Sequence, residues 1–126
     1  MPTALIVDDN SLNSDVLTTL LESRGVTAAT LDSPRFIYQT LEQLPQIDLV
    51  FLDLEFPNHD GFQVIDELKA YPRLRGVPII AYSVHTSEID VARQAGFHSF
   101  IGKPLDARRF PEQLERLLNG IPVWEV

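Results

Sequence analysis

The stretch from Asp48 to Gly61 constrains the fold most strongly, because a short apolar run leads directly into an acidic residue and then into a turn. Residues 49–52 form a continuous run of branched and aromatic side chains, which is typical of a parallel strand covered on both faces. Asp53 follows this run, and a loop rich in turn residues ends the strand. In an open α/β sheet, the carboxyl end of a central strand borders the crevice where ligands bind.

Four other apolar runs have the same strand-like pattern, and a stretch with helical spacing follows each of the five. The four further predicted strands are Thr3 to Val7, Val26 to Leu31, Val77 to Tyr82 and Phe97 to Ile101. The connections are too short for anything but right-handed crossovers, so the pattern predicts an α/β fold with a doubly wound parallel sheet and helices on both faces. We expect five strands in the order 2-1-3-4-5, five helices, and three layers, α/β/α.

Capping residues and apolar stripes predict where the helices begin and which faces they bury. Ser11 is the expected N-cap of the first helix, whose buried stripe would include Val16. Ser33 and Pro34 predict the start of the second helix, with Phe36 on its buried face. Pro111 predicts a distorted first turn or a later start for the last helix.

Composition limits the classes of function. With 126 residues, 44% of them hydrophobic, the chain fits one domain over residues 1–126, with its core at about 3–119 and an apolar tail at 120–126. The chain has no cysteine, and its amino end has no basic stretch before its few apolar residues, so we expect a cytoplasmic protein without a membrane span. A net charge of -8 disfavours binding to nucleic acid.

Polar residues follow several of the predicted strands and would meet at one edge of the sheet. They are Asp8 and Asp9 after the first strand, Asp53 after the third, Ser83 after the fourth and Lys103 after the fifth. Three carboxylates at close range repel one another unless a cation is present, and an all-oxygen cluster suits Mg²⁺. A metal ion and a lysine beside a carboxylate are typical of a site for phosphoryl transfer.

These residues, in this order and each at the end of its own strand, resemble the receiver domain of two-component response regulators. The loop from Phe56 to Gly61 fits the same pattern, and the resemblance extends from about Thr3 to Asn119. It implies a flavodoxin-like fold and a signalling phosphoacceptor rather than an enzyme. The donor would be a sensor histidine kinase or a phosphotransfer domain, and the output would go to an unknown downstream protein.

The resemblance also implies roles for the residues at the predicted site. Asp53 would accept the phosphoryl group, and Lys103 would pair with one of its oxygens. The implied Mg²⁺ ligands are Asp8, Asp9, Asp53 and the backbone carbonyl of Glu55. The peptide bond between Lys103 and Pro104 is often cis in this family.

A second group of implied roles concerns switching and the lifetime of the phosphate. The hydroxyl of Ser83 would move to meet a phosphoryl oxygen, and Phe100 occupies the position of an aromatic switch that turns inward. Glu55 and His85 would border the path of the attacking water and tune the phosphate lifetime. Glu55, as an acid, is expected to slow phosphorylation by anionic donors.

Simpler interpretations of the same residues remain open. Asp8 and Asp9 are common before a helix, Lys103 is common on surfaces, and Phe100 fits an ordinary core position. A pseudo-receiver scaffold or a small phosphohydrolase with an aspartyl intermediate are the alternative functions. The tail, with Trp124, is expected either to fold back on the domain or to anchor a partner or a homodimer.

Overall fold

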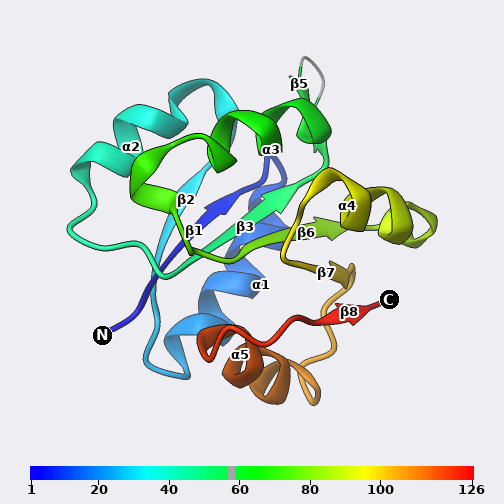
Figure 1. Cartoon of the computed structure of the whole chain (residues 1–126). Coiled ribbons are helices and arrows are strands. Elements are labelled where there is room, and N and C mark those ends of the chain that lie inside the picture. The colour runs from blue at the N-terminus through cyan, green and yellow to red at the C-terminus, as the bar shows by residue number, and fades with distance from the viewer. Residues whose placement is uncertain (57–58) are drawn as a thin grey trace.

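One parallel sheet of six strands forms the centre of the computed structural model, which describes residues 1–56 and 59–126 (Figure 1). The strands lie in the order β2-β1-β3-β6-β7-β8. Their bounds are β1 Thr3–Val7, β2 Thr27–Leu31, β3 Leu49–Asp53, β6 Ile79–Ser83, β7 Ser99–Gly102 and β8 Trp124–Glu125. The first five positions reproduce the predicted order 2-1-3-4-5, so the doubly wound fold is confirmed.

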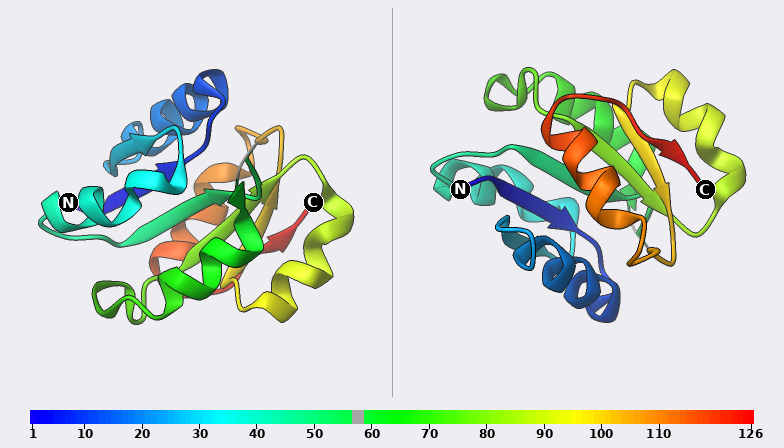
Figure 2. Two further views of the ribbon diagram at one scale, coloured as in Figure 1. Left: turned by 90° about the horizontal axis from the view of Figure 1, so that it is seen from above. Right: turned by 90° about the horizontal axis from the view of Figure 1, so that it is seen from below.

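Helices cover both faces of this sheet. Their bounds are α1 Ser11–Glu22, α2 Ile37–Gln43, α3 Gly61–Lys69, α4 Ile89–Ala95 and α5 Phe110–Leu118. Helices α1 and α5 lie on one face, and α2, α3 and α4 lie on the other, as the two views in Figure 2 show. Three short 3₁₀ turns (Pro34–Phe36, Pro72–Leu74 and Thr86–Glu88) and a small antiparallel hairpin (β4 Glu55–Phe56 and β5 His59–Asp60) complete the described elements.

The two apolar layers follow from the alternation of side chains along the strands. In β1, Leu5 and Val7 pack with α2 and α3, whereas Ala4 and Ile6 face α1 and α5. Every residue of β1 and β3 is buried, as expected for strands covered on both faces. The edge strand β2 is only partly buried, which fits its weaker apolar pattern.

Helix starts differ from the prediction at several positions. The N-cap of α1 is Asn10 and not Ser11, because the Asn10 side chain accepts a hydrogen bond from the N–H of Asn13. Val16 and Phe36 were expected to be buried but are 46% and 47% exposed, since α1 and the 3₁₀ turn before α2 turn these side chains outward. Helix α5 begins only at Phe110, as Pro111 predicted.

The C-terminal tail adds a strand that the prediction of a five-stranded sheet lacked. β8 pairs in parallel with β7, and Val123 beside it is fully buried. The tail therefore folds back on the domain, one of the alternatives that the sequence left open. The sequence pattern does not predict this strand, because β8 has only two residues and so shows no alternation of apolar and polar side chains.

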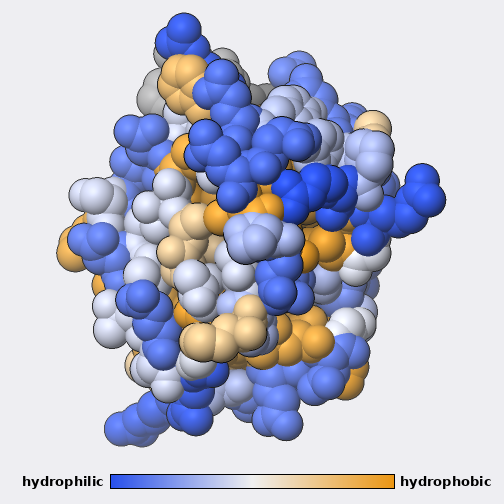
Figure 3. Space-filling model, turned by 90° about the vertical axis from the view of Figure 1, so that its left-hand side faces the viewer, coloured by the Kyte–Doolittle hydropathy of each residue, from blue (hydrophilic) through white to orange (hydrophobic). Residues whose placement is uncertain are grey.

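The amino ends of the strands lie on the left in Figure 1. Figure 3 shows this side of the molecule, where small hydrophobic patches lie between hydrophilic side chains. Among the described residues, no helix has the length and apolar character that crossing a membrane requires.

We predict that Val123→Ala lowers the free energy of unfolding by about 2 kcal/mol, because the substitution removes buried methyl groups and leaves a small cavity. Urea denaturation would measure the change. The matched control is Val126→Ala, since Val126 is 67% exposed and its truncation should change stability by less than about 0.5 kcal/mol. Equal stabilities for the two variants would contradict a role of the tail in the core.

Candidate functional site

The carboxyl ends of β1, β3, β6 and β7 lie at one edge of the sheet and bring the predicted polar residues together. Asp8 directly follows β1, and Asp53 is the last residue of β3, the neighbouring strand. Lys103 directly follows β7, where its N–H donates to the carbonyl of Ser83 at 2.8 Å. The parallel pairing of the strands thus places residues 45 to 95 positions apart on one rim.

The Lys103 ammonium group contacts two carboxylates at the centre of this rim. Its Nζ atom donates to Asp8 Oδ2 at 2.9 Å and lies 3.5 Å from Asp53 Oδ1. The side chains of all three residues are at most 7% exposed. The same ammonium group lies 4.5 Å from the centre of the Tyr82 ring, which adds a cation–π contact. One cation therefore faces two buried anions.

The third aspartate lies at the solvent side of the same cluster. Asp9 is exposed, and one carboxylate oxygen from each of Asp8, Asp9 and Asp53 lies within 4.8 Å of the others. Asp8 also accepts a hydrogen bond from the N–H of Asn10 at 2.8 Å, which orients its carboxylate. Clustered carboxylate oxygens of this kind are the donor set that a hard divalent cation prefers, so the residues present fit such an ion.

Burial raises the pKa of the Asp53 carboxyl to about 7. The Lys103 ammonium opposes this rise, the negative charge of Asp8 adds to it, and the hydrogen bond from the N–H of Glu55 at 3.1 Å again lowers the pKa. Burial also raises the pKa of the Tyr82 hydroxyl, with the charges of Asp8 and Asp53 adding to the effect. The negative charge at the rim is thus only partly compensated by the protein.

Three further residues of the predicted site form a chain of contacts beside Asp53. The Ser83 hydroxyl is fully buried, donates to Glu55 Oε1 at 3.1 Å and accepts from the N–H of His85 at 2.9 Å. Glu55 Oε2 lies 3.0 Å from His85 Nε2. Glu55 and His85, which the family resemblance implies border the path of the attacking water, therefore contact each other, and both are hydrogen-bonded to the Ser83 hydroxyl.

Three further predicted features are the switch position, the peptide bond after Lys103 and the loop after β3. Phe100 is fully buried in the middle of β7 and packs in the same apolar layer as Ala81. The bond between Lys103 and Pro104 is cis. Pro57 and Asn58, which belong to the loop that matched the receiver pattern, lie outside the residues that the structure describes.

Sequence reasoning missed Tyr82, Asn10 and Glu88 as neighbours of the site. Tyr82 is paired with Asp53 across β3 and β6, and its position at the end of an apolar strand was the available signal. Asn10 caps α1, and its N–H holds Asp8. Glu88 brings a carboxylate oxygen within 4.8 Å of the Glu55 and His85 side chains, a contact that depends on the turn before α4 and has no sequence signature.

The fold and the site together define a class of protein. A doubly wound sheet with its strands in this order carries an acidic cluster and a lysine at the switch point, where strands β1 and β3 lie side by side. This combination defines a flavodoxin-like α/β domain with its clustered acids and lysine at the carboxyl edge of the sheet.

The chain belongs to the response regulator receiver domain family, whose model matches residues 4–115. It is 31% identical over 118 residues to the polar-differentiation response regulator DivK of Brucella anthropi, covering 91% of this chain and 94% of DivK. Receiver domains are signalling domains that act with sensor histidine kinases and downstream effectors, and they are not conventional enzymes.

Solved structures show the same fold. The chemotaxis protein CheY4 of Vibrio cholerae superposes with a TM-score of 0.83 at 18% identity, over 93% of this chain and 98% of CheY4. The receiver domain of a sensor histidine kinase from Pseudomonas aeruginosa, solved with a magnesium ion in its active-site cleft, gives a TM-score of 0.81 at 25% identity, over 94% of this chain and 98% of that domain.

We predict that Asp53→Asn stabilises the metal-free protein at pH 8 by about 1–3 kcal/mol. Because the folded pKa of Asp53 is raised, the folded state binds more protons than the unfolded state between about pH 4 and 7, so the wild type loses stability as the pH rises through this range. The gain from the substitution should therefore shrink as the pH falls towards 4.

Urea denaturation in the presence of a chelator, at pH 5 and pH 8, would measure this difference. Asp15→Asn on the exposed side of α1 is the matched control and should have little effect at either pH. A variant that is no more stable than the wild type at pH 8 would show that the charge of Asp53 is fully compensated.

Proposed function

We propose that Asp53 accepts a phosphoryl group and that the chain signals through this modification. The observation that carries the proposal is the rim itself, where Lys103 Nζ lies 3.5 Å from Asp53 Oδ1 and the oxygens of Asp8 and Asp9 lie within 4.8 Å of the Asp53 carboxylate. Lys103 on one side of the Asp53 carboxylate and a divalent cation held by the aspartates on the other would together meet the electrostatic need of phosphoryl transfer.

In the proposed reaction, an Asp53 oxygen attacks the phosphorus of a phosphohistidine. The new O–P bond forms as the N–P bond breaks, and the released imidazole nitrogen takes up a proton. The donor is a sensor histidine kinase or a phosphotransfer domain, and the encounter takes place in the cytoplasm. The protein supplies position and charge but remains modified afterwards, so it is a signalling phosphoacceptor and not a conventional enzyme.

Asp8, Asp9 and Asp53 would hold Mg²⁺, together with the backbone carbonyl of Glu55. When bound, the ion supplies positive charge that relieves repulsion among the aspartates and screens the phosphoryl oxygens from the Asp53 carboxylate. Asp8 is already oriented for this role by Lys103 and by the N–H of Asn10. Lys103 can turn its ammonium group from Asp53 to a phosphoryl oxygen with little movement, since it is placed between both carboxylates.

The Ser83 hydroxyl is the proposed reporter of the phosphate. It would leave the Glu55 carboxylate and donate to a phosphoryl oxygen. The Glu55–His85 pair would then lose the hydrogen bond that Glu55 accepts from the buried Ser83 hydroxyl. Ser83 pairs with Gly102 across β6 and β7, and Phe100, the proposed switch residue, lies two positions before Gly102 in β7. The bound phosphate would thus bias two arrangements of these strands, and a downstream protein partner would recognise one of them.

Incubation with a small phosphodonor and Mg²⁺ should add the mass of one phosphoryl group to the wild type, measured by intact-mass spectrometry. Asp53→Asn should stay unmodified under the same conditions, because it lacks the nucleophile. Lys103→Ala should be modified much more slowly, by about tenfold or more, because the buried cation that faces the phosphoryl group is lost. Asp15→Asn is the control and should be modified like the wild type.

The same experiment separates the alternative functions. Absence of modification in the folded wild type would favour a pseudo-receiver scaffold. Continuous hydrolysis of a phosphate ester, in place of one stoichiometric modification, would favour a phosphohydrolase. Modification of Asp53→Asn to the wild-type extent would place the acceptor elsewhere.

We predict that Glu55→Gln speeds phosphorylation by an anionic small donor by about threefold to tenfold, because it removes a negative charge next to Asp53 and weakens the hold on the Ser83 hydroxyl. Stopped-flow measurement of the modification rate would test this, with Glu22→Gln at the exposed end of α1 as the matched control. The acceleration should fall at high salt. Unchanged kinetics would exclude Glu55 from tuning the reaction.

A further inference from the structure

Tyr82 is the second-to-last residue of β6 and lies beside the acidic rim. It pairs with Asp53 across β3 and β6, and with Ile101 across β6 and β7. Tyr82 is only 2% exposed and packs in the apolar layer that faces α1 and α5. Its ring therefore has little freedom to move, because packed neighbours surround it.

The alternation of side chains along the strands brings this ring to the same face of the sheet as the charged groups. Ile80 and Tyr82 belong to the layer facing α1 and α5, whereas Ala81 belongs to the opposite layer. On β7, Ile101 also belongs to the layer facing α1 and α5, so Lys103, two positions later, falls on that face. An aromatic residue at position 82 is thus placed where it meets the lysine of the site.

The Lys103 ammonium group has three contacts of different kinds among the described residues. Its Nζ atom donates a hydrogen bond to Asp8 Oδ2 at 2.9 Å. It lies 3.5 Å from Asp53 Oδ1, beyond the usual length of a hydrogen bond between charged groups. The third contact is the face of the Tyr82 ring, whose centre is 4.5 Å from Nζ. The ammonium group thus stays close to the proposed nucleophile without bonding to it.

The contact with the ring matters because little water reaches the ammonium group. The side chain of Lys103 is 6% exposed, so its charge has lost most of its hydration. A cation over an aromatic face is attracted more strongly in such a desolvated place than at an exposed site. The Tyr82 ring therefore supplies a substantial share of the attraction that holds this cation in the site.

The ring attracts the cation without adding charge to the rim. Burial raises the pKa of the Tyr82 hydroxyl, and the charges of Asp8 and Asp53 add to the rise, so the side chain stays neutral. A carboxylate at the same position would also attract Lys103, but it would add a further negative charge beside the aspartates and repel a phosphoryl group. A neutral aromatic ring avoids this repulsion.

We propose that Tyr82 is a positioning residue for phosphoryl transfer, because its ring holds the Lys103 ammonium group where it can turn to a phosphoryl oxygen. This inference rests on the proposed function of Asp53. When an Asp53 oxygen bonds to phosphorus, Lys103 exchanges one anionic partner for another, whereas the contact with the ring stays. Without the ring, the ammonium group would be drawn onto the Asp53 oxygen, and this ion pair would have to break before the oxygen could attack.

A graded series of rings at position 82 tests the proposal in the full chain. Tyr82→Phe keeps the ring and should be phosphorylated by a small phosphodonor with Mg²⁺ at nearly the wild-type rate. The same variant, made with phenylalanine fluorinated at one, two or three ring positions, keeps nearly the same size but has a less negative face. Its rate should fall stepwise, by about threefold to tenfold with three fluorines. A purely structural role of the ring would not produce this trend.

Fluorination of Phe51 provides the matched control. Phe51 is buried in the same apolar layer, two residues before Asp53, and its ring centre lies 6.5 Å from that of Phe110. The same fluorinated series at this position should leave the phosphorylation rate unchanged, because the Phe51 ring packs against another ring rather than against the ammonium group. Circular dichroism and urea denaturation check that each variant compared is folded.

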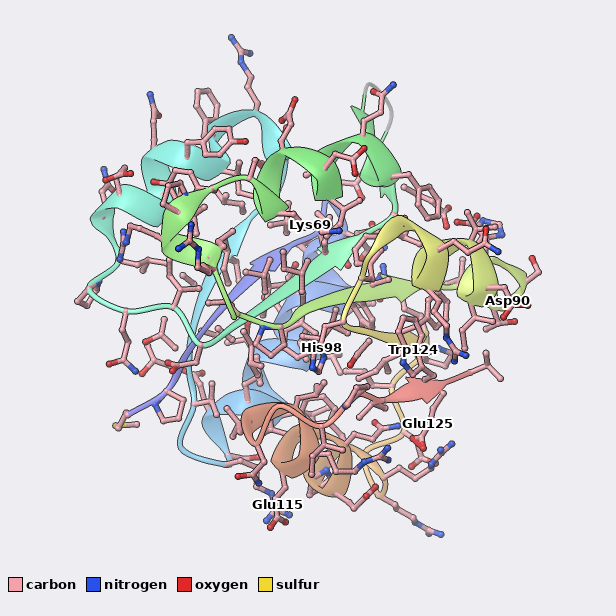
Figure 4. All side chains as sticks on the ribbon, in the orientation of Figure 1. Lys69, Asp90, His98, Glu115, Trp124 and Glu125 are labelled. Carbon is pink, nitrogen blue, oxygen red and sulfur yellow. The ribbon has the colours of Figure 1, made fainter. Side chains whose placement is uncertain are left out.

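The lysine side chains provide a readout that does not depend on phosphorylation. The chain has two lysines, Lys69 and Lys103, so protein isotope-labelled in lysine gives two sets of side-chain signals in NMR spectra. Lys69 is the exposed last residue of α3 (Figure 4), and Lys69→Arg leaves only the Lys103 signals. The ring current of Tyr82 should shift the Hε protons of Lys103 upfield. Tyr82→Phe should keep this shift and Tyr82→Leu should lose it, with the Lys69 signals unchanged.

Two results would overturn the proposal. One is a phosphorylation rate that stays constant across the fluorinated series, which decides the matter even if Tyr82→Leu does not fold. The other is a set of Lys103 signals that stay in place when a folded variant lacks the ring. A wild-type protein that remains unmodified would instead reject the proposed function of Asp53, while the lysine signals would still show whether the Tyr82 ring holds the ammonium group.

Discussion

Lys103 is the only cation that the described side chains place between the buried carboxylates of Asp8 and Asp53, and the geometry of the site depends on it. Taking two acids out of water is costly, and one ammonium group repays only part of that cost. The part of the desolvation cost that Lys103 does not offset raises the pKa of the Asp53 carboxyl. A site left short of positive charge favours a divalent cation, which is the role proposed here for Mg²⁺. The electrostatic imbalance is therefore the basis of the proposed function.

The same rim connects the proposed chemistry to the rest of the sheet. The Ser83 hydroxyl contacts Glu55 on one side, and its strand pairs with β7 on the other. β7 in turn pairs with β8, so the added strand lies two positions from the site in the order of the sheet. Strand β7 thus lies between the Ser83 strand and the C-terminal strand.

Much of the fold was predictable because it depends on local patterns. Apolar runs without alternation predict buried parallel strands, and the order of the elements leaves few topologies, so β1, β3, β6 and β7 lie as expected. Errors occurred where several residues compete for one local role. Asn10 rather than Ser11 caps α1 because the N–H of Asn10 is held by the buried carboxylate of Asp8, a contact that depends on the completed site.

The sequence by itself determined which polar residues stand at strand ends, and parallel pairing then brings Asp8, Asp53 and Lys103 to one rim. Only the tertiary structure decided the partners of individual side chains. Glu55 contacts Ser83 and His85, and Glu125 lies among Arg109, Arg116 and Gln113, because turns and helices bring together groups 9 to 30 positions apart with no periodic spacing. Such contacts depend on packing in three dimensions, whereas the position of a residue along a strand depends on the local pattern of burial.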